Sequence, residues 1–117
     1  MTRCNQNLTE ERWFKLSFFE QMANLGVEVG RVIRWRGECP ERSKAAFESA
    51  LELVDLTIKD KRNRGSRLKE LCRLREVLVD YFCFDNIYGS SDEKWNNYFY
   101  AFNYAARINK INLEHKS

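Results

Sequence analysis

The side chains that could perform chemistry in this chain are four cysteines, one histidine and several acidic residues on expected helices. Cys4, Cys39, Cys72 and Cys83 show no Cys-x-x-Cys spacing, and His115 is the only source of imidazole. A structural zinc site needs four soft ligands, which normally come in pairs at short spacing. We therefore expect no metal and no other cofactor. The simpler interpretation is that Cys72 and Cys83 are reduced thiols on a helix and that the other two lie in loops or tails.

The types and spacing of the residues also argue against catalysis. A di-iron or di-manganese centre in a helical bundle uses Glu-x-x-His from two of its helices, and this chain contains no such motif. Nucleophilic catalysis needs a histidine beside a nucleophile, whereas His115 lies near the chain end, where fraying is expected. Helical nucleases of the HEPN superfamily carry an Arg and a His at a shorter spacing than Arg107 and His115, which have seven residues between them. We therefore expect a protein that is not an enzyme.

Basic residues gather in one segment, which is the candidate for binding an anionic partner. Residues 59–69 contain six basic residues and one acid, Asp60, in a chain whose net charge is only +3. Clustered cations attract phosphates, although a solvated turn whose lysines compensate a helix dipole is the alternative. In a regular bundle, four further basic residues would lie at the same end: Arg3, Arg107, Lys110 and Lys116. The candidate phosphate or nucleic-acid contacts are Lys61, Arg62, Arg64, Arg67 and Lys69.

The stretch from Thr9 to Trp35 has an apolar side that is too wide for a helix buried on one side only. At 100° per residue, its apolar positions cover roughly 220° of the circumference, about twice the arc of an amphipathic surface helix. The helix is therefore either central to its domain or shared with a second chain. Gly26 and Gly30 on this side would let a neighbouring backbone approach closely.

A second apolar face is expected on the last helix. Tyr100, Tyr104 and Ile111, with Arg107 between them, lie away from the inward stripe that contains Trp95. Tyrosine and arginine are enriched in interfaces, and the alternative is that the tyrosines cover the edge of the domain's own core. Together with the first helix, the candidate interface residues are Phe18, Leu25, Val32, Tyr100, Tyr104 and Arg107.

The hydrophobic periodicity predicts four helices, at about residues 9–35, 40–60, 66–83 and 91–112. The expected N-terminal caps are Thr9, Ser66 and a Ser90–Glu93 capping box. Short connections favour antiparallel neighbours. We therefore expect an all-α protein, an antiparallel up-down-up-down four-helix bundle, with a single domain at 9–112 and flexible tails at 1–8 and 113–117.

One charged residue breaks the pattern on the inner side of the third helix. Arg75 falls on the same side as Leu71 and Leu78, where an unpaired charge is costly. We expect it to form a buried ion pair with Asp55, or with Glu48 on the same flank, or else to extend its guanidinium to the edge of the bundle. The alternative is a ligand-binding arginine in a cleft of the bundle.

These features together predict a non-enzymatic helical interaction or accessory module. It is expected to associate with itself, as a homodimer or larger homo-oligomer, or with another protein, through the first helix, the outer face of the last helix or both. The main alternative is a nucleic-acid-associated protein that uses the basic turn at 59–69. The chain shows no apolar signal region and no run of the ~18–20 apolar residues that a membrane span needs. We therefore expect a cytoplasmic protein with no membrane partner.

Overall fold

The computed structural model of the protein describes the backbone of residues 5–116 and the side chains of residues 10–109 and 111. The described residues form five helices: α1 (Asn5–Lys15), α2 (Phe18–Trp35), α3 (Pro40–Lys59), α4 (Ser66–Cys83) and α5 (Asp92–Lys116). The all-α class is confirmed. The four-helix, up-down-up-down bundle is not, because the stretch expected to form the first helix is two helices, α1 and α2.

A capping box at Ser17 divides that stretch. Ser17 has an extended backbone, its Oγ accepts a hydrogen bond from the Glu20 backbone N–H at 3.1 Å, and Glu20 Oε1 accepts one from the Ser17 N–H at 2.9 Å. This reciprocal pair satisfies two backbone donors at the start of a helix. Thr9, the expected cap, lies inside α1. The apolar periodicity runs through Leu16 and Ser17 without a gap, so periodicity alone could not reveal the break.

α3 starts at Pro40, as expected, whereas the expected caps of α4 and α5 are each wrong by one residue. α4 begins at Ser66, and the cap position is Gly65, whose φ of 62° lies in the region that favours glycine. At α5 the cap is Ser91 rather than Ser90, because Ser91 Oγ accepts the Lys94 N–H at 3.1 Å. Ser90 is held instead by the Asn86 side chain, which donates a hydrogen bond to the Ser90 carbonyl oxygen and accepts one from the Ser90 N–H.

The helix bounds also change the extent of the expected tails. α1 begins at Asn5 and α5 continues to Lys116, so both helices extend into the segments expected to be tails. Residues 1–4 and 117 lie outside the described residues.

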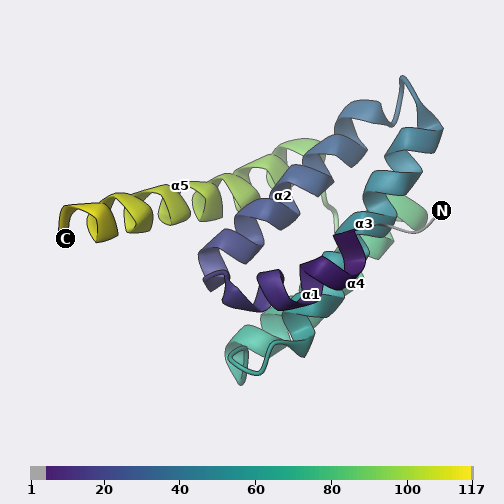
Figure 1. Cartoon of the computed structure of the whole chain (residues 1–117). Helices are drawn as coiled ribbons and strands as arrows, with labels where there is room; N and C mark the ends of the chain where they lie inside the picture. The colour runs from purple at the N-terminus through teal and green to yellow at the C-terminus, as the bar shows by residue number, and fades with distance from the viewer. Residues whose placement is uncertain (1–4, 117) are drawn as a thin grey trace.

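Helix α2 is the central element of the molecule. It packs against α3 on one side and α5 on another, while α4 packs on α3 and α1 crosses α3 (Figure 1). The wide apolar arc of this stretch is therefore used within the chain. Leu25 and Val32 are buried in the core, so their assignment to an interface with a second chain is wrong. Phe18 is partly buried against the same core.

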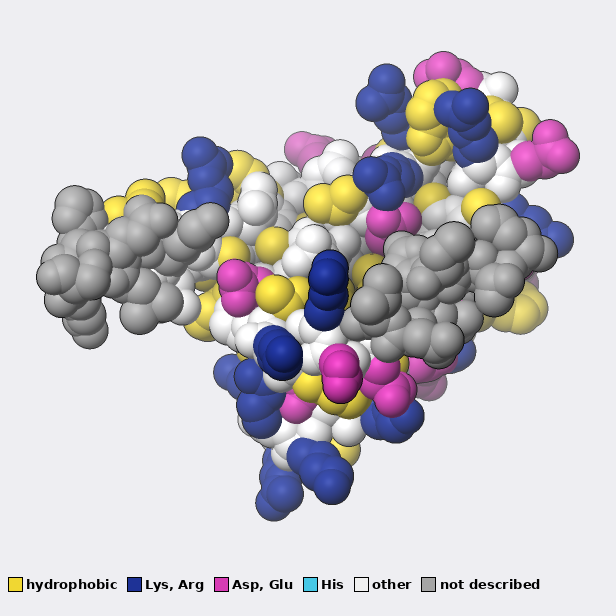
Figure 2. Space-filling view, viewed as in Figure 1, with side chains coloured by type: hydrophobic (Ala, Val, Ile, Leu, Met, Phe, Trp, Pro, Cys, Tyr) yellow, Lys and Arg dark blue, Asp and Glu magenta, His cyan; other side chains and the backbone are white. Residues whose placement is uncertain are grey.

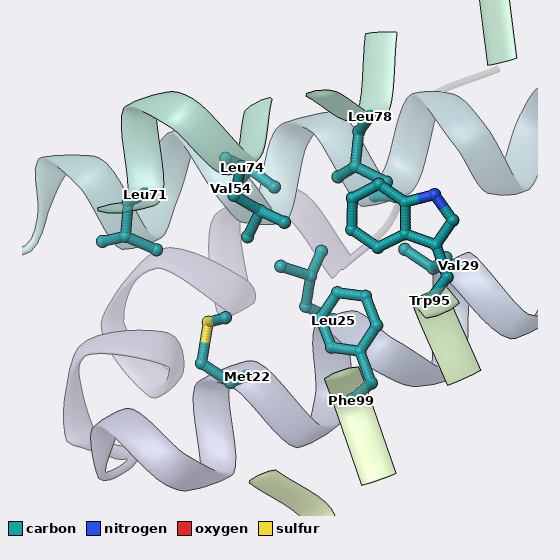
Figure 3. Close-up of a cluster of buried hydrophobic side chains, with 10 residues drawn as sticks. Met22, Leu25, Val29, Val54, Leu71, Leu74, Leu78, Trp95 and Phe99 are labelled. Carbon is teal, nitrogen blue, oxygen red and sulfur yellow. The ribbon is translucent and has the colours of Figure 1, made fainter. Parts of the chain in front are cut away.

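The core lies where α2, α3, α4 and the first half of α5 meet (Figure 3). Trp95 and Phe99 of α5 close it over α2. At Gly26 the two helices come so close that an added Cβ would lie 2.7 Å from Phe99 Cβ, whereas a Cβ at Gly30 would have no such neighbour within 4 Å. The expected close approach is confirmed at Gly26 and is wrong at Gly30. The labelled core residues are Met22, Leu25, Val29, Val54, Leu71, Leu74, Leu78, Trp95 and Phe99.

The second half of α5 projects away from the other helices (Figure 1). The molecule accordingly measures 47 × 33 × 28 Å. In Figure 1 the far end of α5 lies away from the turn between α3 and α4, so the expectation that this end of the helix joins the basic turn is wrong. The side chains of Arg3, Lys110 and Lys116 lie outside the described residues. Within the described part of the chain, the helices are too short or too polar to cross a membrane.

Candidate interaction surfaces

The outer face of α5 carries an exposed apolar stripe. Tyr100, Tyr104, Ile108 and Ile111 are 66%, 57%, 40% and 46% exposed. The exposed guanidinium of Arg107 lies among them. Figure 2 shows hydrophobic side chains along the upper edge of this helix. The structure therefore places Tyr100, Tyr104 and Arg107 on one surface, as the sequence predicts.

This stripe lies on the side of α5 opposite to the core. At 100° per residue, Tyr104 and Ile111 point roughly 180° away from the face that carries Trp95, Phe99 and Phe102. The rings of Phe18, Phe19 and Phe102 pack edge-on or tilted at the start of α2. Beyond this aromatic cluster, α5 has no neighbouring helix in Figure 1. The tyrosines consequently do not cover the edge of the domain's own core.

The turn between α3 and α4 is organised by the buried carboxylate of Asp60. Asp60 accepts hydrogen bonds from the Arg62 backbone N–H at 3.0 Å, from the Arg62 guanidinium at 2.6 Å and from Gln21 Nε2 at 2.9 Å. The Arg62 hydrogen bonds hold the pKa of Asp60 well below its ordinary value, against burial, which raises it. Arg62 Nη2 also donates to the Leu16 carbonyl oxygen at 2.7 Å. Arg62 is therefore a structural residue of the turn and not a free phosphate contact.

The other basic residues of the turn remain at the surface. Arg64 Nε donates to the Lys61 carbonyl oxygen at 2.9 Å, and the Arg67 guanidinium lies 4.0 Å from the centre of the Phe18 ring. Among the described side chains, no acid pairs with Lys61, Arg64, Arg67 or Lys69. Figure 2 shows Lys and Arg side chains gathered at the lower end of the molecule, where this turn lies.

Arg75 and Asp55 form the expected ion pair, but at the surface. Arg75 Nε lies 2.7 Å from Asp55 Oδ1, and the two side chains are 42% and 55% exposed. The hydrogen bond to Asp55 raises the pKa of Arg75. The expectation of a buried pair is wrong, because the long side chain carries its charge past the apolar stripe to solvent.

The hollow beside Arg75 has a mixed wall of charged and apolar side chains, and two of its charged groups, Arg75 and Asp80, are already paired. It measures about 430 Å³ and is bordered by Asp80, Ile87 and Tyr88. The Asp80 carboxylate accepts the backbone N–H groups of Ile87 and Tyr88, both at 3.1 Å. Asp80 therefore holds the connection between α4 and α5, and both of its carboxylate oxygens already accept hydrogen bonds.

One polar cluster was not predicted from the sequence. Asp92, at the start of α5, accepts hydrogen bonds from Tyr81 Oη at 2.6 Å and from Arg36 Nη2 at 2.8 Å. The hydrogen bond from Tyr81 and the one from Arg36 lower the pKa of Asp92. This cluster joins the end of α2, the end of α4 and the start of α5. Its three residues are widely separated along the chain and follow no motif, so no sequence signal could have grouped them.

A second hollow, of about 250 Å³, separates α4 from α5. It is lined by apolar side chains such as Leu74, Val77 and Trp95, with Tyr98 and Glu70 at its edge. Tyr98 Oη donates to Glu70 Oε2 at 2.9 Å, and burial together with this carboxylate raises the pKa of Tyr98. These two polar groups are therefore hydrogen-bonded to each other, and they link α5 to α4.

The residues considered for metal binding are not brought together. Cys72 and Cys83 are exposed free thiols on α4, and Cys39 is a half-buried free thiol between α2 and α3. Cys4 and the side chain of His115 lie outside the described residues. The part of the chain with described side chains contains no group of three or more residues arranged to hold a metal ion.

Comparisons of this chain with protein-family models, with curated proteins and with solved structures found no match. The outer face of α5 and the basic turn are the two candidate interaction surfaces, because of their geometry and charge.

Proposed function

We propose that this protein is a non-enzymatic helical interaction module that forms a homodimer through the outer face of α5. The observation that carries the proposal is the exposed stripe of Tyr100, Tyr104, Ile108 and Ile111 on the outer face of α5, which continues onto its projecting half. Contiguous apolar surface of this kind is uncommon on monomeric proteins and marks interaction sites.

A second copy of the chain fits this stripe because the stripe complements itself. In an antiparallel pair of α5 helices, Tyr100 would face the partner's Ile111, and Tyr104 would face the partner's Arg107. A guanidinium stacked on a tyrosine ring is favourable. A parallel pair would instead oppose the two Arg107 side chains, which repel each other. An isologous, two-fold interface is also the commonest form of protein self-association.

The size of the stripe indicates a weak dimer. From Tyr100 to Ile111 it extends about 17 Å at 1.5 Å per residue. A single helix face of this length buries less surface than the ~1,200–2,000 Å² of a standard stable interface. We therefore expect a dissociation constant in the micromolar range, at about 10–100 μM.

Sedimentation velocity over a concentration series tests the proposal. The wild-type chain should pass from a monomer of 14.0 kDa to a species of twice that mass as the concentration rises. Ile108→Glu places a charge in the stripe and should keep the protein monomeric. Ile87→Glu is the matched control, because Ile87 is 79% exposed but lies in the connection between α4 and α5. A wild-type chain that stays monomeric, or an equal loss of the dimer in both variants, would contradict the proposal.

We also propose that the protein acts in the cytoplasm. Cys72 and Cys83 are exposed free thiols, and exposed thiols stay reduced in a reducing compartment. Thiol alkylation of the protein in freshly lysed cells would test this: full labelling of both cysteines is expected.

A further inference from the structure

The lobe that joins the end of α1 to the turn between α3 and α4 carries a strong local excess of positive charge. Residues 59–69 contain six basic residues and one acid, and residues 10–15 of α1 contain two of each, which leaves a net charge of +5 on the two segments. Two of the three acids in these segments are already paired. Asp60 is bound to Arg62, and Glu10 pairs with Lys59 at 2.8 Å.

The lobe is held in one conformation by buried polar groups. Arg62 connects Asp60 to the Leu16 carbonyl oxygen, and so fixes the turn against the break between α1 and α2. Asn63 is buried and donates from Nδ2 to the Thr57 carbonyl oxygen at 2.8 Å. A charged surface that is already ordered loses little conformational entropy when it binds. The cations of the lobe are therefore presented on a preorganised surface.

We propose that this lobe binds the phosphate backbone of duplex nucleic acid, through Lys61, Arg64, Arg67 and Lys69. These four side chains point from a turn and the adjoining first turn of α4, and none pairs with an acid among the described residues. Phosphate contacts made by lysine and arginine carry affinity without reading the base sequence. We therefore expect binding that is independent of sequence and strongly dependent on salt.

The composition of the lobe favours a duplex over the other polyanions. Residues 61–67 include no hydrophobic side chain that could insert into a membrane. Single strands are bound largely by stacking on exposed aromatic rings. Here Trp13 is buried and Phe18 lies beneath the Arg67 guanidinium. Phe14 is partly buried, and the exposed charged side chains of residues 59–69 are all cations, which match the regular phosphates of a double helix.

Fluorescence anisotropy with the full chain tests the proposal. The probes are a labelled duplex of about 20 base pairs and one of its strands, titrated at about 50–200 mM salt. The duplex should bind more tightly than the strand. Its association constant should fall with salt with a log–log slope of roughly −3 to −4, about 0.9 for each phosphate contact. Reversing three charges (Lys61→Glu, Arg64→Glu, Lys69→Glu) should weaken duplex binding at least about tenfold and flatten the slope by about 2.7. Arg67 is left in place because it packs on Phe18.

A matched variant separates this lobe from the overall charge of the protein. Arg34→Glu, Arg42→Glu and Lys44→Glu change the net charge by the same amount at the other end of α2 and α3, and all three residues are exposed. This variant should keep most of the duplex affinity, and both triple variants should keep the helical circular dichroism of the wild type.

The proposal is overturned by no duplex binding at about 50 mM salt, by an equal loss in the matched variant, or by tighter binding of the single strand. Binding to phosphatidylserine vesicles without duplex binding would also overturn it. The lobe lies away from the α5 stripe, so the monomeric Ile108→Glu variant should still bind the duplex.

Discussion

Among the single residues, Asp60 connects elements that are far apart along the chain. Its buried carboxylate accepts hydrogen bonds from Gln21 of α2 and from Arg62 in the turn, and Arg62 in turn reaches the break after α1. A buried carboxylate is costly unless it is fully hydrogen-bonded. Asp60 meets this condition, and so it contributes to stability only while it is ionised.

The stability of the protein should therefore decrease in acid, and Asp60 should account for part of the decrease. The pKa of Asp60 is lowered in the folded state, mainly by its hydrogen bonds to Arg62. Its contribution is complete above the ordinary aspartate pKa of about 3.9 and is lost as the pH falls below that value. Asp60→Asn should lower the free energy of unfolding by about 2 kcal/mol at neutral pH.

Urea denaturation of the wild type and of Asp60→Asn between about pH 7 and pH 2 measures both effects. The difference in stability between the two proteins should shrink as the pH falls. A constant difference over the whole range would show that the Asp60 carboxylate has an ordinary pKa. Arg75 makes a useful contrast, because its ion pair with Asp55 is half exposed and should contribute no more than about 1 kcal/mol.

Among the helices, α2 and α5 come into close contact at Gly26. A Cβ on Gly26 would meet Phe99 Cβ at 2.7 Å, and Phe99 is a core residue that cannot easily move. Gly30 lies one turn further along the same helix, where an added Cβ meets no such neighbour within 4 Å. The two glycines therefore form a matched pair for measuring the packing of α5.

Gly26→Ala should destabilise the protein by about 1–3 kcal/mol, because the added methyl group overpacks the contact. Gly30→Ala should instead be neutral or stabilising by up to about 1 kcal/mol, since alanine is the better helix former. Thermal denaturation followed by circular dichroism compares the two. Equal effects of the two substitutions would show that α5 does not lie against Gly26 in solution.

The helices also show how far sequence patterns determine this fold. The bounds of α3 and α4 follow the apolar periodicity closely, since Gly65 and Pro40 punctuate the chain where the periodic stripes stop. The apolar periodicity does not reveal the break at Ser17, although Ser17 and Glu20 have the spacing of a capping box. The reason is that apolar residues continue on both sides, and the hydrogen bond from Arg62 to Leu16 that secures the break joins residues 46 positions apart.

At the level of the whole molecule, the two candidate surfaces differ in how well the sequence predicted them. The stripe on α5 depends only on helical spacing, so Tyr100 and Tyr104 could be placed on the outer face without a structure. The membership of the basic lobe depends on tertiary hydrogen bonds and on topology. For this reason the sequence does not reveal that Arg62 is bonded to Asp60 and to the Leu16 carbonyl oxygen, or that the end of α5 lies away from the turn.

The projecting end of α5 also sets the shape of the molecule. The radius of gyration of the Cα atoms is 14.7 Å, whereas a compact domain of this length has about 13 Å. The core residues of α5 end near Phe102, which packs on Phe18 and Phe19. The residues beyond contribute surface to the molecule and little to its core.

Removing the chain after Arg107 should consequently change association and shape but not folding. The truncation deletes Ile108 and Ile111, half of the stripe, while it leaves Trp95, Phe99 and Phe102 in place. We expect the midpoint of thermal unfolding to stay within about 3 °C of the wild type, a shift that corresponds to less than about 1 kcal/mol. Small-angle scattering should show a smaller radius of gyration, and sedimentation should show a monomer. The full-length Ile108→Glu variant is the control, because it should be monomeric and yet keep the larger radius. A fall in the midpoint of more than about 10 °C would mean that the end of α5 packs on the body of the protein, and that the stripe is part of the core and not a surface for a second copy.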